Sequence, residues 1–498
     1  MAVVKQEMNY KKTSFSLHRS STPQCADIFD MILSKKVGPM TAASQDSNQA
    51  LTKNDGNNDN EKDNDVNMES VPEVDRQWLL KLLKKHSSDP RLVPYYAELH
   101  EKYPILKDKA LVVAPMVDQS DLPFRLLCRK YGTNLCFTPM VHAKMFHQKE
   151  AYKKQFWSYV NGTPPGDRPL IVQLCGSDTS SLIYTIRYIL SSKGSVDGFD
   201  LNCGCPQTIA KRGNYGAYLL EKEDGNVVVD VVKKLVEEVG QEIPISVKVR
   251  ILPSGVEDSL KLYKRLVDAG ASMLTIHGRN RMQKGLKTGK TDWDAIKQVV
   301  ELFGDKIPIM ANGGISNLDD VRECLEYTGV DGVMSSEAIL EYPALFTDTN
   351  TEAVGGKRTG PRRMQLAKEY LETADKHPPQ LGGQGNGIKC VRAHIHKILH
   401  EDLTGRNDLR QNIALAQDHD ELRTYFNDIE ELNKVEEHSV ESEGLAWYMR
   451  HRIPRRNDSN PIPRKFQRAT SSTKIGISLE VPSNAAGEDD GNCGEDCH

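Results

Sequence analysis

The sequence has few aromatic residues, no long apolar run and almost no net charge. Only 6% of its 498 residues are aromatic, and 65 basic residues nearly balance 69 acidic ones, which leaves a formal charge of −4. A charge so close to zero excludes a uniformly basic coat for nucleic acid. No stretch reaches about 18 apolar residues and the N-terminus lacks a continuous apolar segment, so we expect neither a membrane span nor a secretory signal.

Closely spaced cysteines of a disulfide scaffold are also lacking. The ten cysteines are dispersed along a long chain, which favours a reducing intracellular compartment. We therefore expect a cytoplasmic protein, with nuclear and mitochondrial locations as open alternatives. Glu7 and Asp27 argue against a mitochondrial leader, although the basic residues near the N-terminus lie among serines.

Composition divides the chain into segments. The stretch from Ser44 to Asp65 is almost wholly polar and has no aromatic residue, so it cannot bury enough surface to fold. Near the other end, Arg450 to Arg468 carries seven basic residues against one acidic residue. The expected segments are a disordered polar and acidic N-terminus at 1–75, a helical lead-in at 76–104, a βα domain at 105–350, a helical domain at 360–440 and a disordered basic, then acidic tail at 445–498.

Within the βα domain, a short apolar run rich in β-formers is repeatedly followed by a turn and an amphipathic helix. Eight such units predict a (β/α)₈ barrel, with a doubly wound open sheet as the alternative. In a barrel, chemistry is expected just after the carboxyl ends of the strands. The eight runs are Ala110–Pro115, Asn134–Pro139, Leu170–Leu174, Gly198–Leu201, Pro244–Val249, Met273–His277, Ile307–Ala311 and Gly332–Ser335.

Helices are predicted from apolar residues at helical spacing and from capping residues. The stretch Val227–Val232 has strand propensity, but its place and length favour a helix. Asp292 and Asn317 are typical of helix N-caps. In the expected helical domain, a small bundle, the predicted helices are Gln365–Lys376, Ile388–His400, Asn407–Gln417 and Asp420–Asn433.

Polar residues at the ends of the fifth and sixth strands are the first candidates for a site. Lys248 lies in an otherwise apolar strand, so we expect it to point into the barrel mouth, where it needs a polar or anionic partner. The alternative is a solvated lysine at a sheet edge. His277 ends the sixth strand beside Arg279, and a single histidine in such a place is either functional or structural. Arg250 and Arg279 are candidate substrate contacts.

Two thiols follow the fourth strand in Asn202-Cys203-Gly204-Cys205-Pro206. The alternatives to a catalytic thiol are a zinc half-site and a packing cysteine. No second Cys pair follows at zinc-ribbon spacing, so we expect no structural zinc and no other metal.

Three further strand ends suggest a phosphorylated planar cofactor. Asn312-Gly313-Gly314 and Ser336-Glu337 follow strands seven and eight, where backbone N–H groups near helix N-termini often cradle a phosphate. Pro115 and Met116 can line a planar ring, and the Gln173 amide offers a donor and an acceptor. Together with Lys248 and His277, these residues suggest flavin mononucleotide, FMN.

The combined motifs resemble the tRNA-dihydrouridine synthase family. Two of them, Ile209-Ala210-Lys211-Arg212-Gly213-Asn214-Tyr215-Gly216-Ala217 and Tyr342-Pro343-Ala344-Leu345-Phe346, are most similar to the eukaryotic branch that acts on D-loop uridines 16 and 17. The resemblance covers about two thirds of the chain. The remaining motifs are Ala114-Pro115-Met116-Val117-Asp118, Asn202-Cys203-Gly204-Cys205-Pro206-Gln207, Val247-Lys248-Val249-Arg250, Ile276-His277-Gly278-Arg279, Asn312-Gly313-Gly314-Ile315 and Asp331-Gly332-Val333-Met334.

The resemblance implies an FMN-dependent reductase of tRNA uridines, in which NADPH or NADH reduces the flavin again after each turnover. It also implies that Cys205 is the general acid and that Asn202 orients the uracil. A thiol is mostly protonated at neutral pH, whereas a carboxylic acid has lost its proton. Lys389, Arg392, His394 and Lys397 are candidates for contacts with tRNA phosphates, and the alternative for each is a solvated helix face. The implied FMN-binding residues are Pro115, Met116, Val117, Gln173, Lys248, His277, Asn312, Gly313, Gly314, Ser336 and Glu337.

Two departures from the family pattern stand out, and two rival functions remain. Gly314 replaces an expected polar residue, and Cys203 places a second thiol beside Cys205. The rivals are an FMN barrel oxidoreductase that acts on a small pyrimidine-like molecule and a non-catalytic RNA-binding protein. We expect tRNA as partner, no membrane association and a monomer.

Overall fold

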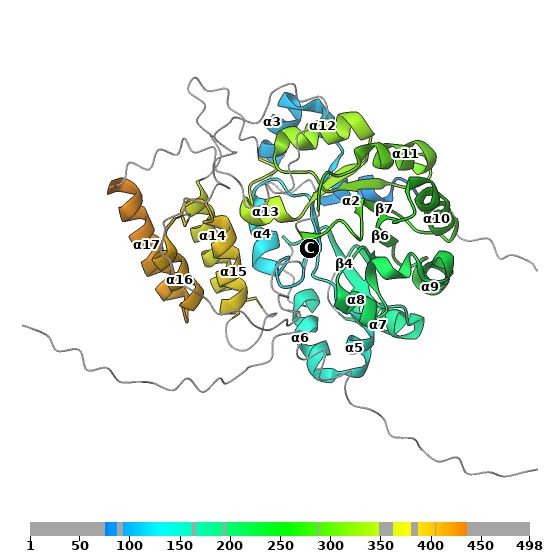
Figure 1. Ribbon diagram of the computed structural model, residues 1–498, viewed down its shortest axis with the longest axis horizontal. Helices are drawn as coiled ribbons and strands as arrows, with labels where there is room; N and C mark the ends of the chain where they lie inside the picture. Colours follow the sequence, from blue (N-terminus) through cyan, green and yellow to red (C-terminus); the bar gives the residue numbers. More distant parts are fainter. Residues whose placement is uncertain are drawn as a thin grey trace, which may run out of the picture. The chain divides into compact units, whose positions relative to one another are not determined.

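The computed structural model describes most of the chain between Asp75 and Val435 (Figure 1). Residues 1–74 and 445–498, where we expect disorder, and the basic segment at 450–468 lie outside the described residues. The described ranges are 75–86, 93–161, 166–192, 196–285, 288–347, 362–379, 387–403 and 405–435.

Eight of the nine strands in the described residues form a closed, wholly parallel barrel. The sheet order is β2-β1-β9-β8-β7-β6-β5-β4-β3, and a further pairing between β2 and β4 closes the ring. The predicted (β/α)₈ barrel is thus confirmed and the open sheet was the wrong alternative. The strands are β1 (Ala110–Val113), β2 (Leu135–Phe137), β3 (Val141–His142), β4 (Leu170–Cys175), β5 (Gly198–Cys203), β6 (Ile245–Ile251), β7 (Leu274–Asn280), β8 (Ile309–Asn312) and β9 (Gly332–Ser335).

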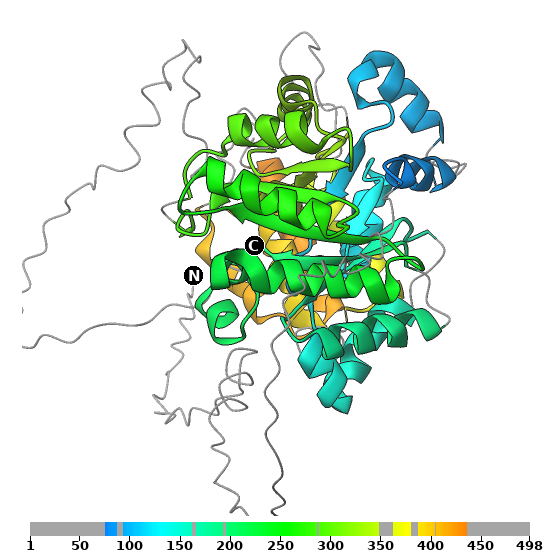
Figure 2. The same ribbon diagram turned by 90° about the vertical axis from the view of Figure 1, so that its right-hand side faces the viewer.

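Nearly every strand residue is buried, because side chains fill the interior of the barrel and helices cover its outside. Figure 2 shows helices packed around the strands. The strands pack closely where the ring closes. A Cβ on Gly332 would lie 2.5 Å from the Ala110 carbonyl oxygen and 2.6 Å from Met310 Cε. Only glycine therefore fits at this position of β9 without a shift of β1.

Helices alternate with the strands as the sequence predicts, and none in the described residues is long and apolar enough to cross a membrane. The stretch at Val227–Val232 is helical, and Asp292 and Asn317 each accept a capping hydrogen bond from a backbone N–H three residues on, at 2.8 Å. The barrel helices are α4 (Leu122–Lys130), α5 (Ala143–Gln148), α6 (Glu150–Asn161), α7 (Thr179–Ser191), α8 (Thr208–Arg212), α9 (Asn226–Val239), α10 (Val256–Asp268), α11 (Trp293–Phe303), α12 (Leu318–Thr328) and α13 (Glu337–Glu341).

The lead-in folds as two helices, α2 (Trp78–His86) and α3 (Val93–Lys102), and a 3₁₀ turn at Pro104–Leu106. The Trp78 indole N–H donates to the carbonyl of Ser272, which precedes β7, at 2.9 Å. The lead-in therefore covers the amino-terminal end of the barrel, opposite the end where chemistry is expected.

Four helices follow the barrel in the described residues: α14 (Arg363–Lys376), α15 (Ile388–Ile398), α16 (Asn407–Leu415) and α17 (His419–Val435). α14 packs on α4, and α15 packs on the loop between β1 and α4. α16 packs on α15, and α17 packs on α14 and α16. The fully buried His394 meets the Asp121 carboxylate at 3.1 Å and stacks on Phe124, while Cys390 Sγ donates to the Asp118 carbonyl at 2.6 Å. Asp121, Cys390 and His394 form the one cluster with metal-ligand chemistry among the described residues, and it joins the barrel to α15.

A buried ion-pair network fastens α4 to the start of β4. Asp167 and Arg125 are fully buried, and the carboxylate accepts hydrogen bonds from Arg125 at 2.7 Å and from Arg129 at 3.0 Å. Arg129 also donates to the carbonyl of Pro169 at 2.6 Å. One carboxylate therefore compensates the positive charges of two guanidinium groups.

Replacing Asp167 by Ala is expected to lower the free energy of unfolding by about 3–5 kcal/mol, because it leaves two buried cations unpaired. Urea denaturation followed by circular dichroism measures the loss. Glu238→Ala, which removes the surface ion pairs of Glu238 with Arg187 and Lys234, is the control and is expected to cost less than about 1 kcal/mol. Equal losses in the two variants would contradict this account of the network.

Candidate active site

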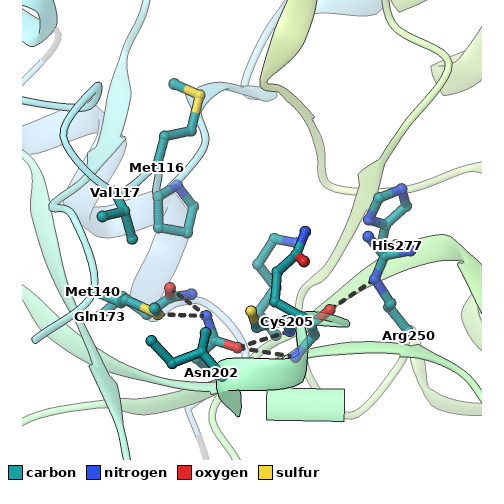
Figure 3. Close-up of a pocket in the computed structure, with 13 residues that line it drawn as sticks. Met116, Val117, Met140, Gln173, Asn202, Cys205, Arg250 and His277 are labelled. Carbon is teal, nitrogen blue, oxygen red and sulfur yellow. Dashed lines mark hydrogen bonds between the residues drawn. The ribbon is translucent and has the colours of Figure 1, made fainter. Parts of the chain in front are cut away.

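A pocket opens at the carboxyl end of the barrel strands and brings together nine of the residues nominated from the sequence (Figure 3). The nominated residues that line it are Pro115, Met116, Val117, Gln173, Asn202, Cys205, Lys248, Arg250 and His277. Met140, Gly204, Gln207 and Ile209 complete the lining. The nominated residues outside the lining are Asn312, Gly313, Gly314, Ser336, Glu337, Arg279, Lys389, Arg392, His394 and Lys397.

A chain of hydrogen-bonded side chains crosses the floor of the pocket. The Gln173 amide donates to the Asp200 carboxylate at 2.8 Å and accepts from the Asn202 amide at 2.8 Å. The Asn202 carbonyl oxygen then accepts from the backbone N–H groups of Gly204 and Cys205, both at 3.1 Å (Figure 3). Gln173 and Asp200 are almost completely buried, so these contacts replace water.

The loop that carries Cys205 is held from its other side by a tight turn. The Ala217 backbone N–H donates to the Cys205 carbonyl at 3.0 Å. Gly216 adopts φ +71°, and a Cβ there would lie 2.6 Å from the Cys205 carbonyl oxygen. Gly216 is therefore required for the close approach. Cys205 is partly exposed to the pocket, whereas Cys203 is fully buried in the core.

Burial shifts three titratable groups of the pocket and its floor toward their neutral forms. It lowers the pKa of Lys248 to about 7, assisted by the nearby Arg250, although part of the lysine side chain faces the pocket. It raises the pKa of Asp200 to about 6 and raises the pKa of the Cys205 thiol. The thiol therefore stays protonated at neutral pH.

The two arginines nominated as substrate contacts hold loops. Arg250 Nε donates to the Gly204 carbonyl at 2.7 Å, so it braces the Cys205 loop while it lines the pocket. Arg279 donates twice to the Gly289 carbonyl, at 2.9 and 3.1 Å, and lies 3.3 Å from His277 Nε2. Their contact with a substrate stays a prediction.

The glycine turn after β8 lies beside the Thr291 hydroxyl group, which has no hydrogen-bond partner among the described residues. Gly313 and Gly314 adopt φ values of +99° and +76°, and a Cβ on Gly313 would lie 2.8 Å from Thr291 Oγ1 and 3.1 Å from the His277 ring. Thr291 Oγ1 is buried and makes no hydrogen bond to the described residues. This turn thus combines space that only glycine leaves open with a free hydroxyl donor.

The nominated residues of α15 lie away from the pocket lining. Lys389 is exposed, and Arg392 is partly buried and donates to the Ala416 carbonyl at 2.9 Å. Lys397 donates to the Gln119 side chain at 2.5 Å. The expectation that His394 contacts a phosphate is wrong, because this histidine is fully buried between α15 and α4.

Sequence reasoning missed Met140, Gln207, Ile209 and the floor residue Asp200. Met140 follows the predicted run Asn134–Pro139, so its place after a strand end was a usable signal. Asp200 lies inside a strand, where only the three-dimensional structure shows that its carboxylate meets Gln173 and not a cation.

Comparison with known proteins gives a family match over most of the described chain. The family described as Dihydrouridine synthase (Dus) matches residues 112–438. The mouse protein named tRNA-dihydrouridine(16/17) synthase [NAD(P)(+)]-like is 39% identical over 305 residues, which are 61% of this chain and 58% of the mouse protein. The Saccharomyces cerevisiae tRNA-dihydrouridine(16/17) synthase [NAD(P)(+)] is 36% identical over 61% of this chain and 68% of its own length.

Solved structures resemble the chain only weakly. A complex of 2-naphthoyl-CoA reductase aligns with a TM-score of 0.39 and 11% identity, over 47% of this chain and 49% of that one. The strand pairings themselves establish the barrel fold.

Replacing Lys248 by Met is expected to change how stability depends on pH. The folded-state pKa of about 7 lies below the ordinary value of 10.5, so the folded protein binds fewer protons than the unfolded chain between these values. Stability from this group therefore rises with pH through that window and is lowest below pH 7. We expect Lys248→Met to melt a few degrees higher than the wild type at pH 7, with the difference vanishing near pH 10.

Thermal unfolding of ligand-free protein across this pH range measures the effect. Lys264→Met is the control, because Lys264 is exposed on α10 and pairs with Asp268. A constant difference between Lys248→Met and the wild type from pH 7 to pH 10 would show that burial does not lower the lysine pKa.

Proposed function

The chain belongs to the dihydrouridine synthase family, and on this premise we propose that it reduces the C5–C6 bond of uridines in the tRNA D-loop to give dihydrouridine. The observation that carries the proposal is one pocket that holds a protonated thiol, Cys205, together with Gln173, Lys248 and His277. The names of the mouse and yeast relatives support positions 16 and 17 as targets.

We propose FMN as the cofactor, with NADPH or NADH as a transient reductant, as the relatives' names suggest. The residues present fit this group. Gly313 and Gly314 have no side chains, so a phosphate can approach their backbone N–H groups closely. The Thr291 hydroxyl, which has no partner among the described residues, can donate to a phosphate oxygen. Pro115, Met116, Val117, Gln173, Lys248 and His277 would hold the ring, while backbone groups of Asn312, Gly313, Gly314, Ser336 and Glu337 would hold the phosphate.

Reduced FMN, when bound, supplies a hydride to one carbon of the uracil double bond. The other carbon needs a proton, and Cys205 is positioned to give it from its thiol. Burial keeps that thiol protonated until transfer, and the positive charge of Arg250 then favours the thiolate that remains. A proton from solvent restores the thiol.

Asn202 has a donor left for the uracil. Its carbonyl oxygen is committed to two backbone N–H groups and one amide hydrogen to Gln173. The remaining contact of the amide nitrogen is with Met140 Sδ at 3.5 Å, and sulfur is a weak acceptor. A uracil carbonyl group that enters the pocket can therefore take this donor. The base must first leave its stack in the tRNA.

The experiment combines the purified wild-type chain with NADPH and unmodified tRNA. We expect a yellow protein that forms dihydrouridine at positions 16 and 17. Cys205→Ala is expected to keep FMN but to lose a factor of about 10²–10⁴ in turnover, because the proton donor is gone. Cys203→Ala is the matched control, since Cys203 is buried in the core, and it should keep turnover within a few-fold.

Three results would contradict the proposal. A colourless protein that binds tRNA would point to a non-catalytic RNA-binding protein. A yellow protein that reduces free pyrimidines and ignores tRNA would point to a small-molecule reductase. Full turnover in Cys205→Ala would remove the thiol from the reaction.

Lys389→Ala tests the proposed tRNA contact of α15. The loss of one phosphate contact is expected to weaken tRNA binding several-fold and to reduce the slope of log affinity against log salt by about 1. Filter binding at several salt concentrations measures both, and FMN content should not change. Lys264→Ala on α10 is the control. An unchanged salt slope in Lys389→Ala would exclude Lys389 from the tRNA interface.

A further inference from the structure

Asp200 is a buried carboxylate to which the proposed reaction gives no role. Only 1% of the residue is exposed, and it lies inside β5. One carboxylate oxygen accepts from the Ser246 hydroxyl at 2.7 Å and the other from the Gln173 amide at 2.8 Å. No guanidinium or ammonium group of the described residues makes a salt bridge to it, so two neutral donors are its hydrogen-bond partners. A buried carboxylate with only neutral hydrogen-bond donors lowers the free energy of unfolding. We therefore expect Asp200 to have a function that offsets this cost.

The carboxylate determines which way the neighbouring amides face. When ionised it can only accept, so the NH₂ end of Gln173 must face it. The carbonyl end of Gln173 then accepts from the Asn202 NH₂ group, and the Asn202 carbonyl end accepts from the Cys205 backbone N–H. Reversing either amide would place donor against donor at one of these contacts. The chain of amides thus has one direction, with an obligate acceptor at one end and obligate donors at the other.

The fixed Gln173 amide has one N–H and one carbonyl lone pair left for a ligand, in a set order. This pair complements a ring N–H beside a carbonyl group, which is the edge of a flavin ring. We propose that Asp200 is a positioning residue, which holds the Gln173 amide in the one orientation that pairs with the flavin and, through Asn202, holds the Cys205 loop. The inference rests on the proposed function, because it takes the ligand to be FMN.

Two side chains besides the hydrogen-bond partners are electrostatically coupled to Asp200. The carboxylate attracts the Lys248 ammonium group on β6. Its negative charge also disfavours the thiolate form of Cys203 on β5. The charge of Asp200 therefore also acts on Lys248. Variants must separate the hydrogen bond from the charge.

Three variants of the full-length chain make this separation. Asp200→Leu removes both the acceptor and the charge at similar size, and Asp200→Asn removes the charge but keeps a carbonyl acceptor for Gln173. Ser246→Ala removes the other partner of the carboxylate and leaves the amide chain intact. FMN affinity is measured by flavin fluorescence without tRNA, with the flavin absorption spectrum as a second readout.

We expect Asp200→Leu to bind FMN at least tenfold more weakly than the wild type, with a shifted absorption band. Asp200→Asn should recover affinity to within threefold of the wild type, and so should Ser246→Ala. Wild-type affinity in Asp200→Leu would overturn the inference. Equal losses of FMN affinity in the Leu and Asn variants would also overturn it. They would show that Asp200 acts through its negative charge on Lys248 and not through its hydrogen bond to Gln173.

If Asp200→Leu does not fold, the pH dependence of the Asn variant decides. Below about pH 6 the wild-type carboxyl group takes up a proton and can also donate, so it no longer fixes the amide. Both proteins are compared in a Lys248→Met background, because the Asp200 charge raises the pKa of Lys248 and this lysine therefore titrates differently in the two proteins. The FMN phosphate titrates in both and cancels, so the ratio of Asp200 to Asp200→Asn affinity should fall between pH 7.5 and pH 5. A constant ratio overturns the inference.

The outcomes also separate this inference from the proposed function. A wild type that binds FMN but leaves tRNA uridines intact overturns only the proposed function. A wild type that binds no FMN overturns both.

Discussion

The closure of the parallel ring is the constraint on which the rest of the structure depends. β1 and β9 are separated by more than 200 residues, yet Ala110–Val113 pairs in register with Gly332–Ser335. The pairing of β2 with β4 closes the other side past the short β3. Because all strands are parallel, closure collects their carboxyl ends at one rim, and side chains that are distant in sequence meet in a single pocket (Figure 3).

Inside that rim, exclusion of water favours the neutral form of three titratable groups. It raises the pKa of the Cys205 thiol and of the Asp200 carboxyl group, and it lowers the pKa of the Lys248 ammonium group. A protonated thiol, directed amides and a lysine that titrates near neutrality are thus products of one physical cause. The same exclusion makes an unpaired polar group costly, which is why Gln173 bonds to both Asp200 and Asn202.

The sequence predicts the barrel well because parallel strands buried on both faces leave continuous apolar runs, and polar residues that end those runs, such as Lys248 and His277, mark the rim. Other features need tertiary contacts. His394 is a polar residue among basic residues of an amphipathic helix, so the sequence suggests that it is exposed. It is instead buried against Asp121. Asp200 is hidden by its strand, and the two-residue β3 is too short to leave any periodic pattern.

The loop between β1 and α4 serves two neighbours at once. Its first residues, Pro115, Met116 and Val117, line the pocket, while Asp118 and Asp121 bond to Cys390 and His394 of α15. The β1–α4 loop and α15 therefore fit each other, and neither can be exchanged without the other. A chimera that joins this barrel to the C-terminal helices of another family member would need to carry the corresponding β1–α4 loop with them, or it would lose the pocket wall together with the joint.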